Sequence, residues 1–215
     1  TSIAVFPGSI ALSVAYSEAL ALVLIAWTLL CLVRNQYGWV FVPILMLSVT
    51  RGVLAPIVAV IIWHTIHRYK DFGTSGRGFV KPRKSEMLAL SLAVVVAGAM
   101  SFLWPAIAGY VTGDPAALVK TQYAWHGRDH GLTPFGAWYS LFANDTAVTI
   151  FLVCVAASVI AWSFSKKARS LGPEIQAWGG AYVGYLIATI GPTTSILRYL
   201  SLSILLQATI ILGAR

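Results

Sequence analysis

Long runs of apolar residues, separated by short polar segments, extend over the whole of this chain. A transmembrane helix needs about 20 mostly apolar residues to cross a hydrocarbon core of about 30 Å, and several runs approach that length. The pattern predicts spans at 19–33, 39–50, 53–67, 87–111, 146–164, 177–191 and 199–213. A further apolar stretch at 3–15, interrupted by Pro7 and Gly8, is either the end of a span or a re-entrant segment. We therefore expect an all-α fold, a polytopic transmembrane helical bundle of about 7–8 membrane segments that forms one domain over 1–215.

The segment 39–67 places one arginine in the middle of apolar sequence. A single helix over this segment would bury Arg51 near its centre, at a cost of at least about 2.5–3.5 kcal/mol. Two shorter helices joined at Thr50-Arg51-Gly52 would instead place the arginine at one membrane face. We therefore expect a helical hairpin with Arg51 at its tip, in preference to one long helix.

Lysine and arginine are concentrated in two connections, 67–86 and 165–170. Short loops rich in basic residues remain on the cytoplasmic side of a membrane, so both connections are predicted to be cytoplasmic. Two predicted spans separate them, and the loop 112–145 between these spans is therefore expected on the outer side. We expect a multi-pass protein, in a bacterial plasma membrane, whose active face is extracytoplasmic.

Composition supports the membrane interpretation. Hydrophobic residues make up 58% of the chain and charged residues only 10%, against roughly 25% charged in soluble domains. The net charge of +8 lies in short clusters between apolar runs and not on one folded face, which argues against a nucleic-acid partner. Membrane lipids are the partners that such a surface implies.

With this topology, the polar residues that would be costly to bury in a membrane all lie on the outer side. They are Tyr16 and Glu18 before the span 19–33, Arg51 at the hairpin tip, the loop 112–145, and the segment 193–198 with Arg198. Arginine binds phosphate bidentately and stays charged, so Arg51 and Arg198 are candidates to hold the phosphate of a lipid. The alternative is that Glu18 and Arg198 merely extend to the membrane interface.

The outer loop carries a second group of candidates, in which aromatic rings alternate with hydrogen-bonding groups. These are Gln122, Tyr123, Trp125 and His126. Such a set suits sugar rings, and it equally suits an interfacial aromatic belt.

Other chemistries find little support in the sequence. His126 and His130 with Asp114 and Asp129 have no metal-ligand spacing on a helix, so we expect no metal, and no cofactor motif is present. His64 and His67 are interpreted as interface histidines at a span end. Cys31 and Cys154 lie in apolar runs, where we expect neither a disulfide nor thiol chemistry.

Several short motifs, in order along nearly the whole chain, resemble one family. They are Phe6-Pro7-Gly8, Tyr16-Ser17-Glu18-Ala19-Leu20, Thr50-Arg51-Gly52, Thr112-Gly113-Asp114-Pro115, Gln122-Tyr123-Ala124-Trp125 and Thr194-Ser195-Ile196-Leu197-Arg198-Tyr199. Together they resemble the integral-membrane mannosyltransferases of the glycosylphosphatidylinositol mannosyltransferase II kind and their actinobacterial relatives, within the GT-C superfamily. The chain departs from the family at Gly52, where proline is usual, and at His126, where a second aromatic residue is expected.

The resemblance implies transfer of mannose from a polyprenyl or dolichyl phosphate donor to a lipid or glycan acceptor on the outer face. For such a reaction we expect Arg51 and Arg198 at the donor phosphate, and Tyr16, Glu18, Gln122, Tyr123, Trp125 and His126 at the sugar or acceptor. In the family, the acidic residue that acts as general base lies in the first outer loop. We therefore expect this residue, and further N-terminal spans, in a segment upstream of Thr1. The catalytic residue itself is therefore unknown.

Two other functional classes remain open on the sequence. One is a non-catalytic membrane subunit that retains a lipid-phosphate site and works with a partner membrane subunit. The other is a transporter of lipid-linked sugars, which would use the same outer site without chemistry.

Overall fold

The computed structural model describes residues 17–74, 83–126, 146–163, 165 and 171–189, and these are helical with short connections, in agreement with the expected all-α class. The helices are α3 (Glu18–Val33), α4 (Phe41–Thr50), α5 (Leu54–Thr74), α6 (Lys84–Met100), α7 (Leu103–Thr112), α8 (Ala117–His126), α10 (Thr146–Ser163) and α12 (Pro173–Thr189). The predicted segments 3–15 and 199–213, and residues 127–145, lie outside the described part of the chain.

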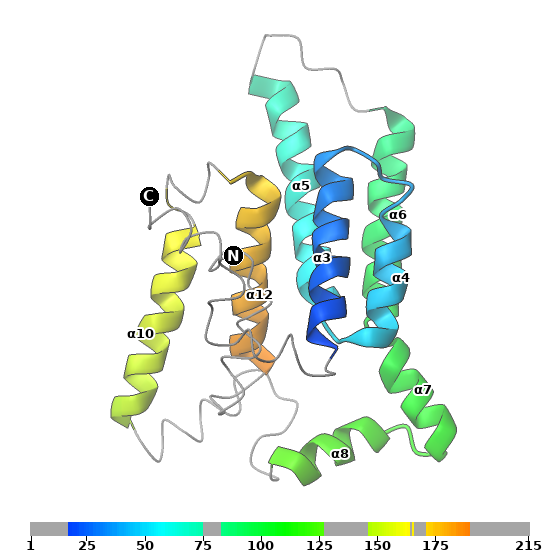
Figure 1. Ribbon diagram of the computed structural model, residues 1–215, viewed down its shortest axis with the longest axis vertical. Coiled ribbons are helices and arrows are strands. Elements are labelled where there is room, and N and C mark those ends of the chain that lie inside the picture. Colours follow the sequence, from blue (N-terminus) through cyan, green and yellow to red (C-terminus); the bar gives the residue numbers. More distant parts are fainter. Residues whose placement is uncertain (1–16, 75–82, 127–145, 164, 166–170, 190–215) are drawn as a thin grey trace.

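Most of the helices run up and down, roughly parallel to one axis (Figure 1). α5 packs against both α6 and α12, α3 packs against α4, and α10 lies beside α12. α3 and α5 begin, and α4 ends, at one end of this bundle, which we call the Glu18 end. α3 ends, and α6 begins, at the opposite end, which we call the Lys84 end.

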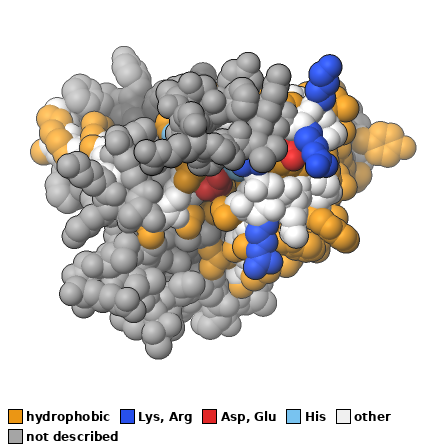
Figure 2. Space-filling model, turned by 90° about the horizontal axis from the view of Figure 1, so that it is seen from above, with side chains coloured by type: hydrophobic (Ala, Val, Ile, Leu, Met, Phe, Trp, Pro, Cys, Tyr) orange, Lys and Arg blue, Asp and Glu red, His pale blue; other side chains and the backbone are white. Residues whose placement is uncertain are grey.

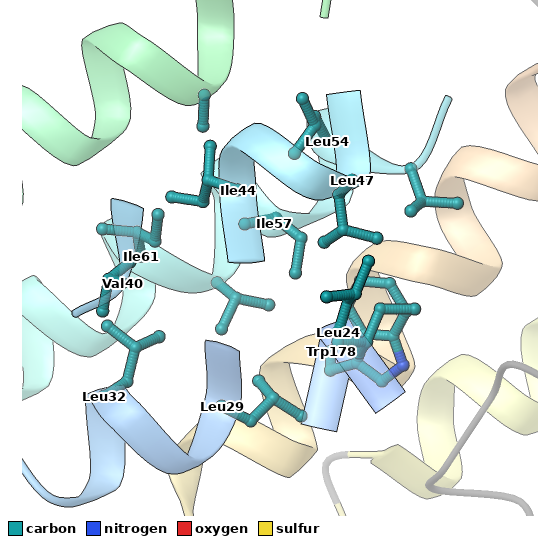
Figure 3. Packing of buried hydrophobic residues seen from close by; sticks show 14 of the residues in the cluster. Leu24, Leu29, Leu32, Val40, Ile44, Leu47, Leu54, Ile57, Ile61 and Trp178 are labelled. Atoms are coloured by element: carbon teal, nitrogen blue, oxygen red, sulfur yellow. The ribbon is translucent and has the colours of Figure 1, made fainter. Parts of the chain in front are cut away.

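The core lies where α3, α4, α5 and α12 meet (Figure 3). Leucine and isoleucine side chains from these helices interdigitate, and Ile44, Leu47, Ile57 and Ile61 are fully buried. Trp178 on α12 is also fully buried, and its ring stacks on Tyr182 with centroids 4.9 Å apart. This apolar packing sets the position of the helix ends that carry polar groups.

The predicted helical hairpin is confirmed. α4 ends at Thr50 and α5 begins at Leu54, and Arg51 adopts an extended backbone conformation (φ −161°, ψ 144°) that ends the helix. The Val53 amide donates to the Arg51 carbonyl at 2.8 Å, which closes the tight connection. At the other end of α4, Asn35 takes a left-handed conformation (φ 56°), which asparagine tolerates better than most residues, and turns the chain from α3 towards α4.

Two predicted loops are partly helical instead. α5 continues to Thr74 and α6 starts at Lys84, so both ends of the segment 67–86 are helical. The helix continues past 67 because the following residues include no proline, and no glycine before Gly73. Within 112–145, α8 begins at Ala117, shortly after Gly113, whose φ of 69° ends α7 in the left-handed region that favours glycine.

The predicted span 87–111 begins earlier and is interrupted. A turn at Ser101 and Phe102 separates α6 from α7. Pro105, in the first turn of α7, has no backbone N–H with which to continue the helical hydrogen bonds, which explains the break. Lys84–Thr112 taken together is the one described stretch that is long and apolar enough to cross a membrane, while the apolar helices Glu18–Val33, Phe41–Thr50 and Leu54–Arg68 are shorter.

Candidate functional site at the Glu18 end

The hairpin tip and the start of α3 meet in an ion pair. Arg51 Nη1 lies 2.9 Å from Glu18 Oε1, and it donates a hydrogen bond of 3.2 Å to Ser17 Oγ. The Glu18 side chain is 1% exposed and that of Arg51 is 17% exposed. The apolar packing of α3 against α4 thus brings together two of the residues that the sequence singled out, although 33 positions separate them along the chain.

Local structure favours a carboxylate at residue 18. Glu18 is the first residue of α3, where the positive end of the helix dipole and the unpaired amides favour negative charge. Ser17 occupies the N-cap position without a side-chain capping bond, and its hydroxyl accepts from Arg51 instead. The side-chain oxygens of Ser17 and Glu18, at the start of α3, therefore both contact the guanidinium of Arg51.

A tyrosine from α12 completes this arrangement. The Tyr185 hydroxyl donates a hydrogen bond of 2.6 Å to the carbonyl of Gly52, the residue next to Arg51. This contact fixes the hairpin tip against α12, which is 133 residues away in sequence. The sequence does not single out Tyr185, because one tyrosine inside an apolar run gives no local signal of its partner.

The other predicted site residues are distributed as follows. Gln122, Tyr123, Trp125 and His126 lie on α8, which contacts α7 and lies towards the Glu18 end of the molecule (Figure 1). The predictions for Tyr16 and Arg198 fall outside the described residues, so Arg51 and Glu18 form the described part of the site.

Asp114, before α8, has a structural role. One of its carboxylate oxygens accepts from the Ala116 amide at 3.0 Å and the other accepts from Lys120 Nζ. The hydrogen bond from Lys120 lowers the pKa of Asp114, which is partly exposed, and keeps it ionised. The Asp114 carbonyl accepts from the Ala117 amide and so supports the first turn of α8.

A second polar cluster lies at the Lys84 end, and it corrects the interpretation of His64 as an interface histidine. His64 on α5 is buried, with Nδ1 2.7 Å from Glu174 Oε1 on α12 and Nε2 3.1 Å from the Tyr37 hydroxyl. Tyr37 lies between α3 and α4, and its hydroxyl donates to Asn35 Oδ1 at 2.7 Å. Burial raises the pKa of Tyr37, so the phenol keeps its proton at neutral pH.

Two arrangements of protons satisfy this chain of contacts. In the first, His64 carries protons on both ring nitrogens and lies as an imidazolium between the Glu174 carboxylate and the Tyr37 oxygen. In the second, Tyr37 donates to Nε2 of a neutral ring whose Nδ1–H donates to Glu174, with the Asn35 amide turned to present its N–H. Both tie α12 to α5, so we assign this cluster to the stability of the bundle.

Comparison with known proteins gives no family for this chain: no family model matches it, and neither a curated protein nor a solved structure does.

Proposed function

We propose that this chain is the membrane-embedded part of a glycosyltransferase, a mannosyltransferase in the resemblance described above, that takes its sugar from a polyprenyl or dolichyl phosphate. The observation that carries the proposal is the Glu18–Arg51 pair, which places a partly exposed guanidinium at one end of a bundle of apolar helices. In this proposal the bundle has about 7–8 membrane segments, and the Glu18 end faces the extracytoplasmic side.

The surface of the helices supports membrane embedding. Large apolar side chains point outward along α3, α4 and α6, where a water-soluble bundle would carry polar ones. On α6 and α7, only 17% of the apolar stretch is buried, so this stretch is no core helix. A hydrocarbon environment would cover these surfaces.

The chemistry of arginine supports a phosphate ligand at the hairpin tip. A guanidinium presents five N–H donors in a planar fork, a geometry that matches the oxygens of a phosphate group. In the proposed reaction, the bond between the anomeric carbon and the phosphate oxygen breaks as an acceptor hydroxyl oxygen attacks that carbon. The acceptor proton passes to a carboxylate base, and the lipid phosphate leaves with the bonding electron pair. Arg51, together with Arg198, would stabilise the negative charge that develops on this phosphate.

In place of the predicted contact with the sugar or acceptor, the buried Glu18 would orient Arg51 in this scheme. Because its carboxylate is buried and paired with the guanidinium, it holds the arginine at the hairpin tip. Tyr16 and the aromatic residues of α8 are proposed to contact the sugar or the acceptor.

The test measures two quantities separately, the binding of the lipid-linked donor and the transfer of its mannose to acceptor lipid. The purified native chain is incubated with radiolabelled polyprenyl-phosphate-mannose and a membrane-lipid extract, and Arg51→Gln and Arg198→Gln are compared with the control Lys120→Gln. We expect each arginine variant to lose at least about 100-fold in transfer, as for removal of one group that stabilises developing charge, and the control to keep it. Unchanged transfer in both arginine variants would remove the centre of the proposal. Binding of the donor without transfer by the native chain would favour a subunit that needs a catalytic partner.

A further inference from the structure

Basic side chains mark the end of the bundle opposite to the Glu18–Arg51 pair. Arg34 follows the last residue of α3, and Arg83 and Lys84 lie at the start of α6. All three are exposed. Figure 2 looks down on this Lys84 end and shows Lys and Arg side chains there, with hydrophobic side chains along the flank.

These cations are not neutralised within the described part of the chain. No ion pair involves Arg34, Arg83 or Lys84 among the described residues. Of the acids at this end, Glu174 is bonded to His64, and no ion pair of Glu86 with these cations is formed among the described residues. The other end differs, because Arg51 and Lys120 are paired there with Glu18 and Asp114.

An apolar stripe begins directly beside two of these cations. Leu88, Leu92 and Val95 are exposed by 70%, 51% and 65%, and with Lys84 they lie on one face of α6 because they are three or four positions apart. From Lys84 to Val95 the helix rises about 16 Å. Half of a hydrocarbon core of about 30 Å, the depth of one leaflet, is about 15 Å.

We propose that Arg83 and Lys84 bind the headgroup phosphate of an anionic phospholipid, whose acyl chain lies along Leu88, Leu92 and Val95. The match is one of charge at the helix end and of an apolar stripe at least as long as one leaflet is deep. A phospholipid has this form, with an anion at one end of an apolar chain that spans one leaflet. The inference rests on the membrane embedding in the proposed function, and not on sugar transfer.

The position of this site separates it from the proposed donor site. Lys84 and Arg51 lie at opposite ends of the bundle, so one lipid headgroup cannot occupy both sites. The donor is itself an anionic lipid, and the experiment must therefore treat the two ends independently.

The test is lipid binding by the purified full chain in neutral detergent. Native mass spectrometry measures the retention of dioleoyl phosphatidylglycerol against dioleoyl phosphatidylcholine. The native chain and the matched control Lys120→Gln should both prefer the anionic lipid. The double variant Arg83→Gln/Lys84→Gln should lose roughly fivefold of this preference for each charge removed. Helical content by circular dichroism confirms that each variant is folded.

Three further measurements complete the design. Leu92→Asn should weaken retention of both lipids, because it interrupts the stripe without changing the cations. Soluble glycerol phosphate should not compete; competition at equal concentration would identify a site for a free anion and overturn the proposal. Arg51→Gln should lose binding of the polyprenyl phosphate donor but keep the preference for phosphatidylglycerol, which separates this site from the proposed function. An unchanged preference in the double variant, or a change of oligomeric state in place of lipid retention, would also overturn it.

Discussion

The Glu18–Arg51 pair combines two effects that mutation can separate. Removing one partner of a buried ion pair leaves an uncompensated charge and costs about 3–5 kcal/mol, whereas replacing both partners by apolar residues of similar size is often neutral. Because Arg51 is 17% exposed, we expect Glu18→Ala to destabilise the chain by an amount at the lower end of that range. The double variant Glu18→Met/Arg51→Met should recover most of the lost stability.

Donor binding then distinguishes a structural arginine from a functional one. If Arg51 holds the donor phosphate, the double variant is stable but binds no polyprenyl phosphate. Denaturant unfolding in detergent micelles and a donor-binding assay measure the two quantities on the same preparations. Donor binding that recovers together with stability would show that the pair serves only the fold.

The buried contact between His64 and Glu174, at the Lys84 end, can be tested by comparing two substitutions at Glu174. Glu174→Gln keeps an oxygen acceptor for the ring N–H, so we expect it to cost about 1 kcal/mol. Glu174→Ala leaves a buried imidazole nitrogen without its partner and should cost about 1–3 kcal/mol. Thermal unfolding of both variants checks this order. Equal effects of the two substitutions would mean that the hydrogen bond contributes little to the packing of α12 on α5.

At the scale of elements, the start of α12 depends on one glycine. Gly172 has φ of 100°, and Pro173 then occupies the first helical position, where its missing N–H carries no cost. Gly172→Ala should destabilise the chain by about 1–3 kcal/mol, because a side chain in this region is strained. A Cβ atom there would lie 3.5 Å from Glu174 Oε2, an ordinary van der Waals contact, so the expected cost comes from the backbone conformation alone.

Gly180 provides the matched control within the same helix. A Cβ atom at this position meets nothing within 4 Å, so Gly180→Ala should stabilise α12 by about 0.5–1 kcal/mol through helix propensity. Thermal unfolding of the two single variants measures the contrast. Similar shifts in the same direction would mean that the backbone at Gly172 is not strained.

The helical class and the hairpin tip could both be predicted from local sequence. Long apolar runs predict helices, and a charged residue within such a run predicts a break. An arginine in the middle of a predicted membrane span would be costly to bury, and a break in the helix at Arg51 avoids that cost. The extension of α5 and the existence of α8 were missed, because hydropathy marks the apolar part of a helix and not its ends. Of the candidate site, Glu18 and Arg51 were predicted from their unusual setting. Tyr185 was not, since packing across 133 residues selects its partner.

For the whole molecule, the distribution of charge predicts one orientation in the membrane. The cations at the Lys84 end have no described acidic partners, and a cluster of basic residues remains on the cytoplasmic side. The Glu18 end, with its paired charges, would then face outward. This orientation places the proposed transfer on the extracytoplasmic face and the anionic phospholipid in the cytoplasmic leaflet.

Cysteine labelling tests this orientation directly. In a background with Cys31→Ala and Cys154→Ala, Lys84→Cys and Lys120→Cys each introduce one reactive thiol at an exposed position. α6 and α7 lie between these two positions and would cross the membrane once. A membrane-impermeant maleimide should therefore label position 120 in intact cells and position 84 only in inverted vesicles. Labelling of both from one side would mean that this stretch does not cross, and the two ends of the bundle could not then serve opposite leaflets.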